Sequence, residues 1–308
     1  GSPDLPAHLE ALGDELSSPE LVVCLDSGCG DYERLWVTTS LRGLVSVDLR
    51  VDVLTEGVHS GAAGGIVPSS FRIARTLLDR IEASGDGRLL IDELFPDIPE
   101  ERRGQATQSA ETLGRPPAFP WAGGTHPATD DVAEQLLNRT WGPALEVIGA
   151  DGLPPLADAG NVARPTTTLG LSIRIPPGVD PDAITTRLTE LLTADSPSGA
   201  MVSVSPGWGA TGWDAPPTAP WLAKALERAS TAWFDEEPRW IGEGGTIPFM
   251  AMLGEQFPDA QFVVTGVLGP GSNAHGPNEF LDVAFAERLT GCIVDVLHAH
   301  ATLADSMR

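Results

Sequence analysis

The stretch that decides the fold reads LVVCLDSGCG and runs from Leu21 to Gly30. Its first five residues are all apolar, which is typical of a strand buried on both faces of a parallel sheet. The run ends at Asp26, and a glycine-rich loop follows. Because ligands of open α/β sheets bind at the carboxyl ends of strands, Asp26 stands where a binding residue is expected.

Alternation of strand and helix returns near the C-terminus. Apolar periodicity predicts helices at 219–234, 247–256 and 278–300, and an apolar strand at 262–267 lies between the last two. A short amphipathic helix is predicted at 3–17. The two ends of the chain are therefore expected to form one α/β domain with a mostly parallel sheet.

The middle of the chain has a different pattern. From Val45 to Val53, and again from Leu169 to Ile175, apolar and polar residues alternate, which is typical of antiparallel strands with one exposed face. Helices are predicted from Pro68 and over 181–194, and a further strand over 201–205. Two strand–helix–strand units on an antiparallel sheet form a split βαβ pattern.

These patterns predict two domains. An α/β domain, residues 1–37 and 208–308, is interrupted by an α+β domain, residues 38–207. Within the insertion, residues 95–160 are rich in proline and are expected to be irregular, with at least one helix near 129–138.

Composition excludes several classes of function. Lys and Arg total 19 against 43 for Asp and Glu, a net charge of −24, so binding to nucleic acid or to anionic membranes is not expected. No apolar run reaches about 18 residues, and the N-terminus lacks a signal-peptide pattern. The three cysteines, Cys24, Cys29 and Cys292, are too few for a disulfide framework, which favours a cytoplasmic location.

Two glycine-rich segments are further candidates for chemistry. Gly242 to Pro248 reads GEGGTIP and precedes a predicted helix, and His275 lies in a Gly/Pro/Asn loop after a predicted strand. A glycine-rich helix start favours anions, and an imidazole can bind a metal. Each segment also has a structural explanation, since such loops cap helices and loop histidines are usually solvated.

Together these segments resemble a known family, the di-zinc exopeptidases and deacylases that include carnosinase, peptidase V, peptidase T and aminoacylase. Their order and spacing are most similar to the carnosinase branch. The resemblance is carried by residues 21–26, 39–43 with 58–61, 171–175, and 243–248 with 273–275.

The resemblance implies roles for residues of the α/β domain. Asp26 matches a carboxylate that binds one zinc ion, and His275 matches a histidine that binds the other. The resemblance also implies a loop that lines the substrate pocket, formed by Glu243, Gly244, Gly245 and Thr246.

The inserted domain resembles the family's lid, which also forms the homodimer. His59 matches the lid histidine that reaches the partner subunit's active site and polarises the scissile carbonyl. Asn161 falls where the family has a polar residue near that carbonyl, and Arg174 matches the arginine that binds the substrate's terminal carboxylate. An Arg fork suits bidentate binding of a carboxylate.

Half of the family's metal site has no match. The family's His-x-Asp, bridging Asp and Glu-Glu pair all precede the position of Asp26, and no His-x-Asp occurs in this chain. Glu100-Glu101 and Glu236-Glu237 lie in the wrong segments and are interpreted as solvated, while Ser2 to Leu5 resembles the stretch just after the family's pair. With about three protein ligands needed per catalytic zinc, this chain is expected to bind no zinc tightly.

The resemblance therefore implies a metal-dependent hydrolase of dipeptides or N-acyl amino acids, which uses two zinc ions in its full-length form. The chain alone, lacking most metal ligands and the general base, is expected to be inactive. The alternative is a non-catalytic dimerising protein that binds small carboxylates at Arg174.

Overall fold

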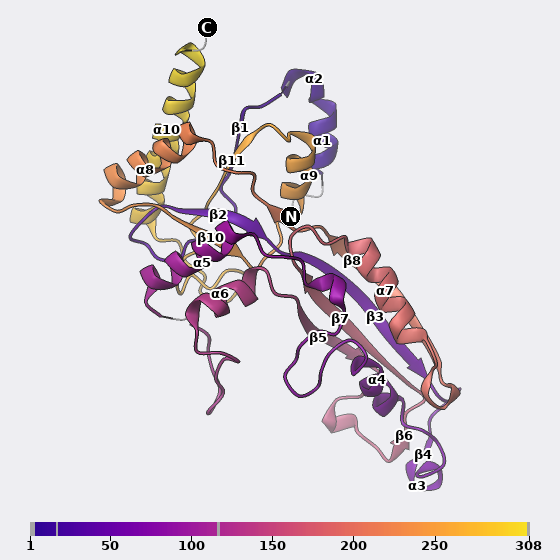
Figure 1. The fold of residues 1–308 in the computed structure, drawn as a ribbon. Coiled ribbons are helices and arrows are strands. Elements are labelled where there is room, and N and C mark those ends of the chain that lie inside the picture. Colours follow the sequence, from indigo (N-terminus) through magenta and orange to yellow (C-terminus); the bar gives the residue numbers. More distant parts are fainter. Residues whose placement is uncertain (1–3, 17, 116–117, 307–308) are drawn as a thin grey trace. The chain divides into compact units, whose positions relative to one another are not determined.

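The computed structural model describes residues 4–16, 18–115 and 118–306. The chain divides into two compact units (Figure 1). The first consists of Gly1–Arg42, Asp97–Trp141 and Gly212–Arg308, and the second of Gly43–Pro96 and Gly142–Thr211. This grouping differs from the predicted domain limits chiefly at 97–141, which packs within the first unit although it falls inside the predicted insertion.

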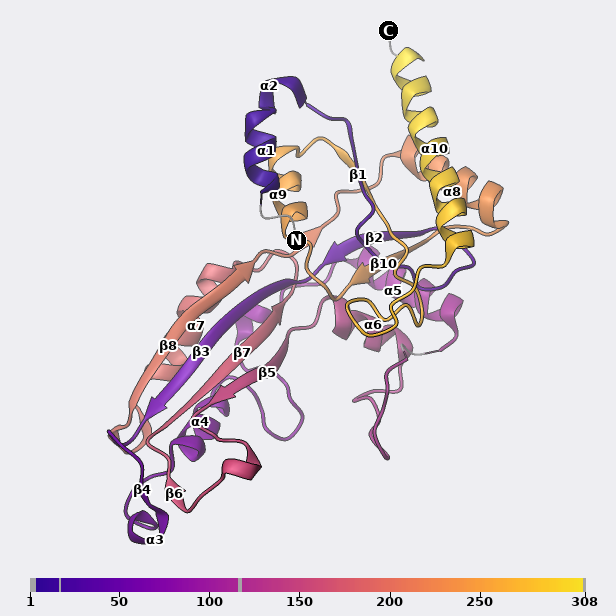
Figure 2. The same cartoon turned by 180° about the vertical axis from the view of Figure 1, so that it is seen from behind.

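A four-stranded antiparallel sheet with strand order β5-β7-β3-β8 forms the second unit (Figure 2). Its strands are β3 (Gly43–Asp52), β5 (Ala144–Asp151), β7 (Thr166–Ile175) and β8 (Met201–Ala210). In β7 every second residue is buried, as the alternating sequence predicts. With helices after β3 and β7, this order is the predicted split βαβ arrangement.

The core of the second unit lies between one face of the sheet and two helices, α4 (Ser70–Leu78) and α7 (Pro181–Thr193). Leu77, Leu171 and Leu188 are fully buried there. Each such side chain stabilises the fold by about 1.5–3 kcal/mol through its removal from water. The short helices η1 (Asp92–Leu94), η2 (Leu156–Asp158) and η3 (Pro197–Gly199) lie in its connections.

A two-stranded ribbon is attached to this unit. It pairs β4 (Val58–His59) with β6 (Val162–Ala163) in antiparallel register, and α3 (Ser60–Ala63) follows β4 directly. The ribbon brings together two segments that are far apart in the sequence.

Parallel strand pairs organise the first unit. β1 (Leu21–Cys24) pairs with β11 (Gln261–Val264), and β10 (Arg239–Glu243) pairs with β2 (Trp36–Leu41). On its other side, β2 pairs with the antiparallel strand β9 (Trp213–Asp214). The two predicted strands pair in parallel, but both are shorter than predicted, since β1 ends at Cys24 and β11 at Val264. In β1 only Cys24 is buried and Leu25 is 56% exposed, so this strand is not buried on both faces as predicted.

Close backbone packing joins the loops that follow these strands. The Ser27 and Thr38 hydroxyls lie 2.7 Å apart and link the β1 loop to β2. A Cβ on Gly266 would lie 1.8 Å from the Ser27 carbonyl oxygen, so only glycine fits at this position.

Seven described α-helices surround the strands of the first unit. They are α1 (Leu5–Ala11), α2 (Gly13–Leu16), α5 (Glu100–Leu113), α6 (Val132–Thr140), α8 (Pro220–Phe234), α9 (Pro248–Gln256) and α10 (Val283–Ser306). The predictions at 219–234 and 247–256 are correct to within a residue. The last helix begins five residues later than predicted, and the N-terminal segment forms two short helices. Ser2 and Pro3 of the Ser2–Leu5 resemblance, and Pro3 and Ser17 at the ends of the predicted N-terminal helix, lie outside the described residues.

Helix α5 corrects the prediction that 95–160 is mostly irregular. Its buried residues are Arg102, Ala106 and Ser109, so it has no apolar stripe by which the sequence could reveal it. Arg102 is 6% exposed and donates to the Asp214 carboxylate at 2.7 Å and to the Ala215 carbonyl at 2.6 Å. A charged network therefore holds this helix against β9.

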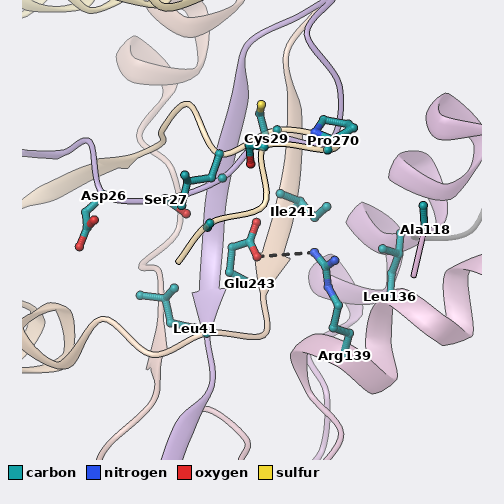
Figure 3. Close-up of a pocket in the computed structure, with 18 of the residues that line it drawn as sticks. Asp26, Ser27, Cys29, Leu41, Ala118, Leu136, Arg139, Ile241, Glu243 and Pro270 are labelled. Atoms are coloured by element: carbon teal, nitrogen blue, oxygen red, sulfur yellow. Dashed lines mark ion pairs between the residues drawn. The ribbon is translucent and has the colours of Figure 1, made fainter. Parts of the chain in front are cut away.

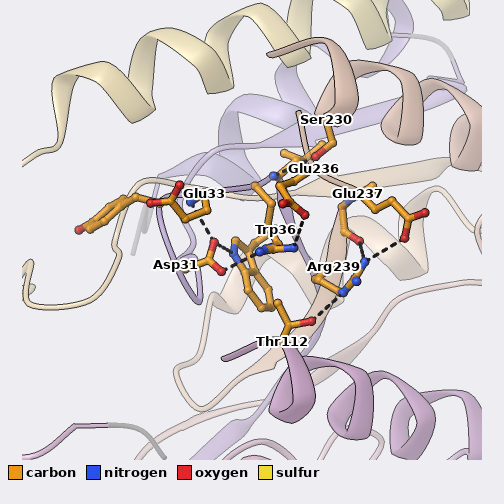
Figure 4. Close-up of polar contacts among 12 residues, drawn as sticks. Asp31, Glu33, Trp36, Thr112, Ser230, Glu236, Glu237 and Arg239 are labelled. Carbon is orange, nitrogen blue, oxygen red and sulfur yellow. Dashed lines mark hydrogen bonds and ion pairs between the residues drawn. The ribbon is translucent and has the colours of Figure 1, made fainter. Parts of the chain in front are cut away.

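A second polar network fixes the start of β2 (Figure 4). Arg34 pairs with Asp31 and with Glu236, each at 3.1 Å, and the indole N–H of fully buried Trp36 donates to Asp31 at 2.9 Å. Glu236 and Glu237 are largely exposed, as predicted, but each is also paired with an arginine. In the described part of the chain, no helix has the length and apolar character needed to cross a bilayer.

Candidate active site

A cavity of about 610 Å³ lies in the first unit, where its parallel strands end. The loops after β1 and β11 and the ends of β2 and β10 form one side, and residues of α5, α6 and the segment between them form the other. This position is the ligand-binding edge of an open α/β sheet, and the volume suits a small ligand.

Asp26 and His275 both line this cavity. Asp26 follows β1 and His275 follows β11, and because these strands are parallel neighbours their carboxyl ends lie at the same edge. Both side chains belong to exposed residues. The two residues that the sequence proposes as metal ligands therefore line the same cavity, and their role as ligands stays a prediction.

The His275 loop has an unusual backbone. His275 has φ +60° and Asn273 has φ +54°, values that cost non-glycine residues of order 1–3 kcal/mol. The Glu279 carboxylate accepts from the His275 backbone N–H at 3.2 Å. Gly269 allows Tyr32 to pack against the start of the loop, since a Cβ there would lie 2.3 Å from its ring.

The described residues do not complete a metal site. Among them, no group of three or more His, Cys, Asp or Glu side chains is placed to hold an ion. Asp26 and His275 offer oxygen and nitrogen donors that zinc accepts, but catalytic zinc takes about three protein ligands. These residues therefore fit individual ligand roles and not a self-contained centre.

Glu243 lies at the end of β10 and is directed toward Arg139 of α6 (Figure 3). Its Oε2 lies 3.5 Å from an Arg139 terminal nitrogen, and 23% of its side chain is exposed. Gly28 makes room for it, because a Cβ there would lie 2.8 Å from Glu243 Oε1. Burial raises the pKa of Glu243, while Arg139 and a hydrogen bond with the Gly244 backbone oppose that rise.

The rest of the predicted pocket loop is fixed by Arg42. The Arg42 side chain donates to the Gly244 carbonyl at 3.2 Å, and the Thr246 hydroxyl donates to the Arg42 carbonyl at 2.7 Å. Gly245 and Thr246 line the cavity with Glu243, whereas Gly244 is not among the described lining residues.

Two cavity residues were missed by sequence reasoning. Arg139 lies near the end of α6, and its Nε is buried without a hydrogen-bond partner among the described residues. Cys29 follows Asp26 by three residues, and its pKa is raised to about 12, mainly by burial. Its thiol is therefore protonated at neutral pH and is a poor nucleophile. No sequence pattern distinguished either residue.

The three predicted lid residues lie in the second unit. His59 is in register with Val162, and the Asn161 carbonyl accepts from the Ser60 N–H at 2.9 Å, so His59 and Asn161 are neighbours on the ribbon. Arg174 lies near the far end of β7. It is eight residues beyond Thr166, about 26 Å along a strand, and is therefore remote from the ribbon.

Comparisons with known proteins cover nearly the whole chain. Residues 39–200 match the M20 peptidase dimerisation domain. The chain is 30% identical over 287 residues to the cysteinylglycine-S-conjugate dipeptidase of Corynebacterium striatum, with 87% of this chain and 57% of that protein aligned.

Solved structures share the fold. The di-peptidase Dug1p of Saccharomyces cerevisiae matches with a TM-score of 0.78 at 19% identity, covering 98% of this chain and 64% of that one. Human carnosine dipeptidase 1 matches with a TM-score of 0.73 at 22% identity, covering 97% and 64%. This chain therefore spans less than two thirds of the length of these relatives.

The family match extends over slightly more than half of the chain, and it contains the segments that carry His59, Asn161 and Arg174. It confirms the resemblance inferred from the sequence. The chain belongs to the M20 family of metallopeptidases.

Proposed function

We propose that this chain supplies substrate-binding and lid residues to a metal-dependent dipeptidase. The observation that carries the proposal is that Asp26, Glu243 and His275 line one cavity at the carboxyl ends of parallel strands. Relatives with the same fold include proteins named as dipeptidases. The α/β domain would bind substrate, and the inserted domain would act as lid and dimerisation domain.

Within the cavity, Asp26 and His275 each supply one ligand, and zinc is the metal we propose. The described residues contain no group of three or more His, Cys, Asp or Glu side chains placed to hold an ion, and we propose that the full-length protein supplies the other ligands and the general base. Glu243, Gly244, Gly245 and Thr246 form the substrate-binding loop. Because the matching relatives include proteins named as dipeptidases, we propose dipeptides as the main substrates in preference to N-acyl amino acids.

Distances within the second unit support a homodimer. A dipeptide extends only about 7 Å, whereas β7 separates Arg174 from the His59–Asn161 ribbon by about 26 Å. One substrate cannot contact both groups of the same subunit. We therefore propose that His59 and Asn161 polarise the scissile carbonyl in the partner's site, while Arg174 binds the substrate carboxylate in its own.

The three buried, unpaired cysteines suit a reducing compartment, and we propose a cytoplasmic location. The alternative function, a non-catalytic dimer that binds small carboxylates at Arg174, is favoured only by the incomplete metal site.

One experiment separates the two functions. The native gene product and the 308-residue chain are assayed for amino-acid release from dipeptides and from N-acetyl amino acids, with and without added zinc. We expect zinc-dependent release from dipeptides by the gene product and none by the chain alone. Carboxylate binding without hydrolysis in both preparations would instead establish the alternative.

A further inference from the structure

The imidazole of His59 is held by a specific hydrogen bond. The Gly61 backbone N–H donates to His59 Nδ1 at 3.1 Å, and this contact caps helix α3. A nitrogen that accepts from an amide must carry a lone pair and no proton. In the neutral ring the proton is therefore on Nε2, the opposite edge of the imidazole.

Gly61 also provides the space that the ring occupies. A Cβ at this position would lie 2.9 Å from His59 Cε1 and 3.1 Å from His59 Nδ1. Real Cβ contacts are rarely this close, so any larger residue at position 61 displaces the ring. Gly61 thus supplies both the hydrogen-bond donor to His59 Nδ1 and the space that the imidazole ring occupies.

The backbone on either side of His59 is already fixed. His59 is in register with Val162 of β6, and the Ser60 N–H donates to the Asn161 carbonyl at 2.9 Å. The Ser60 carbonyl in turn accepts from the Gly64 N–H at 2.8 Å. The freedom that remains is rotation of the imidazole, and the hydrogen bond from Gly61 restrains it.

We propose that Gly61 is a positioning residue for His59, which it holds in the tautomer that presents Nε2–H to a ligand. This inference deepens the proposed function and rests on it for its catalytic meaning. A residue that polarises a carbonyl must donate a hydrogen bond, and a ring protonated on Nδ1 would present a bare acceptor instead. His59 is exposed, so its Nε2 edge is available to another molecule.

The tautomer can be measured without any assay of activity. Histidine labelled with ¹⁵N is incorporated into the 308-residue chain, and long-range ¹H–¹⁵N correlations are recorded at about pH 8, where ordinary imidazoles are neutral. His59 is assigned by the signals lost in His59→Asn. We expect the Nε2–H pattern in the wild type and a mixture of tautomers in Gly61→Ala.

A matched control tests whether the effect is specific. Ala62→Ser adds one atom to an exposed position of α3 next to Gly61 and should leave the His59 pattern unchanged. Circular dichroism checks that each variant is folded. An Nδ1–H form in the wild type, or a Gly61→Ala spectrum identical to that of the wild type, would overturn the proposal.

The catalytic consequence is measured in the native gene product. Loss of one transition-state donor lowers kcat about 10²–10³-fold, and we expect that for His59→Asn, which can still cap α3. Gly61→Ala should lower kcat about 10-fold with little change in KM, and Ala62→Ser should not. If the wild-type protein hydrolyses no dipeptide, the proposed function fails while the NMR result still decides the tautomer. If His59→Asn lowers kcat but Gly61→Ala retains the wild-type value, the positioning role of Gly61 fails while the proposed function stands.

Discussion

The Arg139 guanidinium lies 3.5 Å from the Glu243 carboxylate on the cavity wall. The two residues come from α6 and β10, elements that are more than 90 residues apart in the sequence. Burial raises the pKa of Glu243, and Arg139 is the charged group that opposes the rise. The charge of the Glu243 carboxyl group therefore depends on its ion pair with Arg139.

Removing the charge of Arg139 should raise the pKa of Glu243 further. In Arg139→Gln the carboxylate loses its cationic partner while its burial persists, so the proton is held more tightly. A ¹³C carboxyl titration of the folded chain measures the change. Arg139→Lys is the matched control because it keeps the positive charge, and a pKa equal in the Gln and Lys variants would contradict this account.

The same group should make stability depend on pH. The pKa of Glu243 is raised in the folded state, so Glu243 binds protons more strongly in the folded than in the unfolded chain. The contribution of this proton binding to the free energy of unfolding is therefore lost as the pH rises above the ordinary glutamate pKa of about 4.3. Glu243→Gln should remove this decline. Urea unfolding across pH 4–8 tests the prediction, and parallel curves for wild type and variant would refute it.

Substitution of Gly266 should be severely destabilising. A Cβ would lie 1.8 Å from the Ser27 carbonyl oxygen, and backbone atoms cannot move aside without disturbing the β1–β11 loops. We expect Gly266→Ala to lower the free energy of unfolding by about 3 kcal/mol. Gly245→Ala, whose Cβ meets no described atom within 4 Å, should change it by less than about 0.5 kcal/mol.

Loss of Arg102 should weaken the attachment of α5. Arg102→Ala leaves the Asp214 carboxylate and the Ala215 carbonyl without their buried donor, which should cost about 2–3 kcal/mol. The neighbouring exposed Arg103, changed to Ala, is the control. Equal unfolding midpoints for the two variants would show that the network does not stabilise this helix.

Mixed dimers test the division of roles between subunits. If His59 acts in the partner's site and Arg174 in its own, dimers that combine His59→Asn with Arg174→Gln subunits contain one intact site. Random mixing should then restore about a quarter of wild-type dipeptidase activity. No recovery above that of the separate variants would place both residues in the same site.

The fold was predictable from the sequence where a strand buries only one of its two faces. Val45–Val53 and Leu169–Ile175 alternate because one side of each strand faces the core, and that period is visible in the sequence. Helix α5 was missed because its inward face carries Arg102 and Ser109, which pack through charge and hydrogen bonds.

The candidate site was predictable to the extent that its residues follow strands. Asp26 comes directly after an apolar segment and His275 lies in the loop that follows β11, so the parallel pairing of β1 with β11 places both loops at one edge of the sheet. Arg139 reaches the cavity only through the packing of α6 beside β10, and no local pattern encodes that contact. Its importance emerged from the three-dimensional structure alone.

The most direct test of the central claim is anomalous scattering from crystals of the native gene product grown with zinc. We predict zinc peaks within about 2.0–2.2 Å of a carboxylate oxygen of Asp26 and within about 2.0–2.1 Å of an imidazole nitrogen of His275. Zinc bound elsewhere, with neither residue in contact with it, would contradict the account.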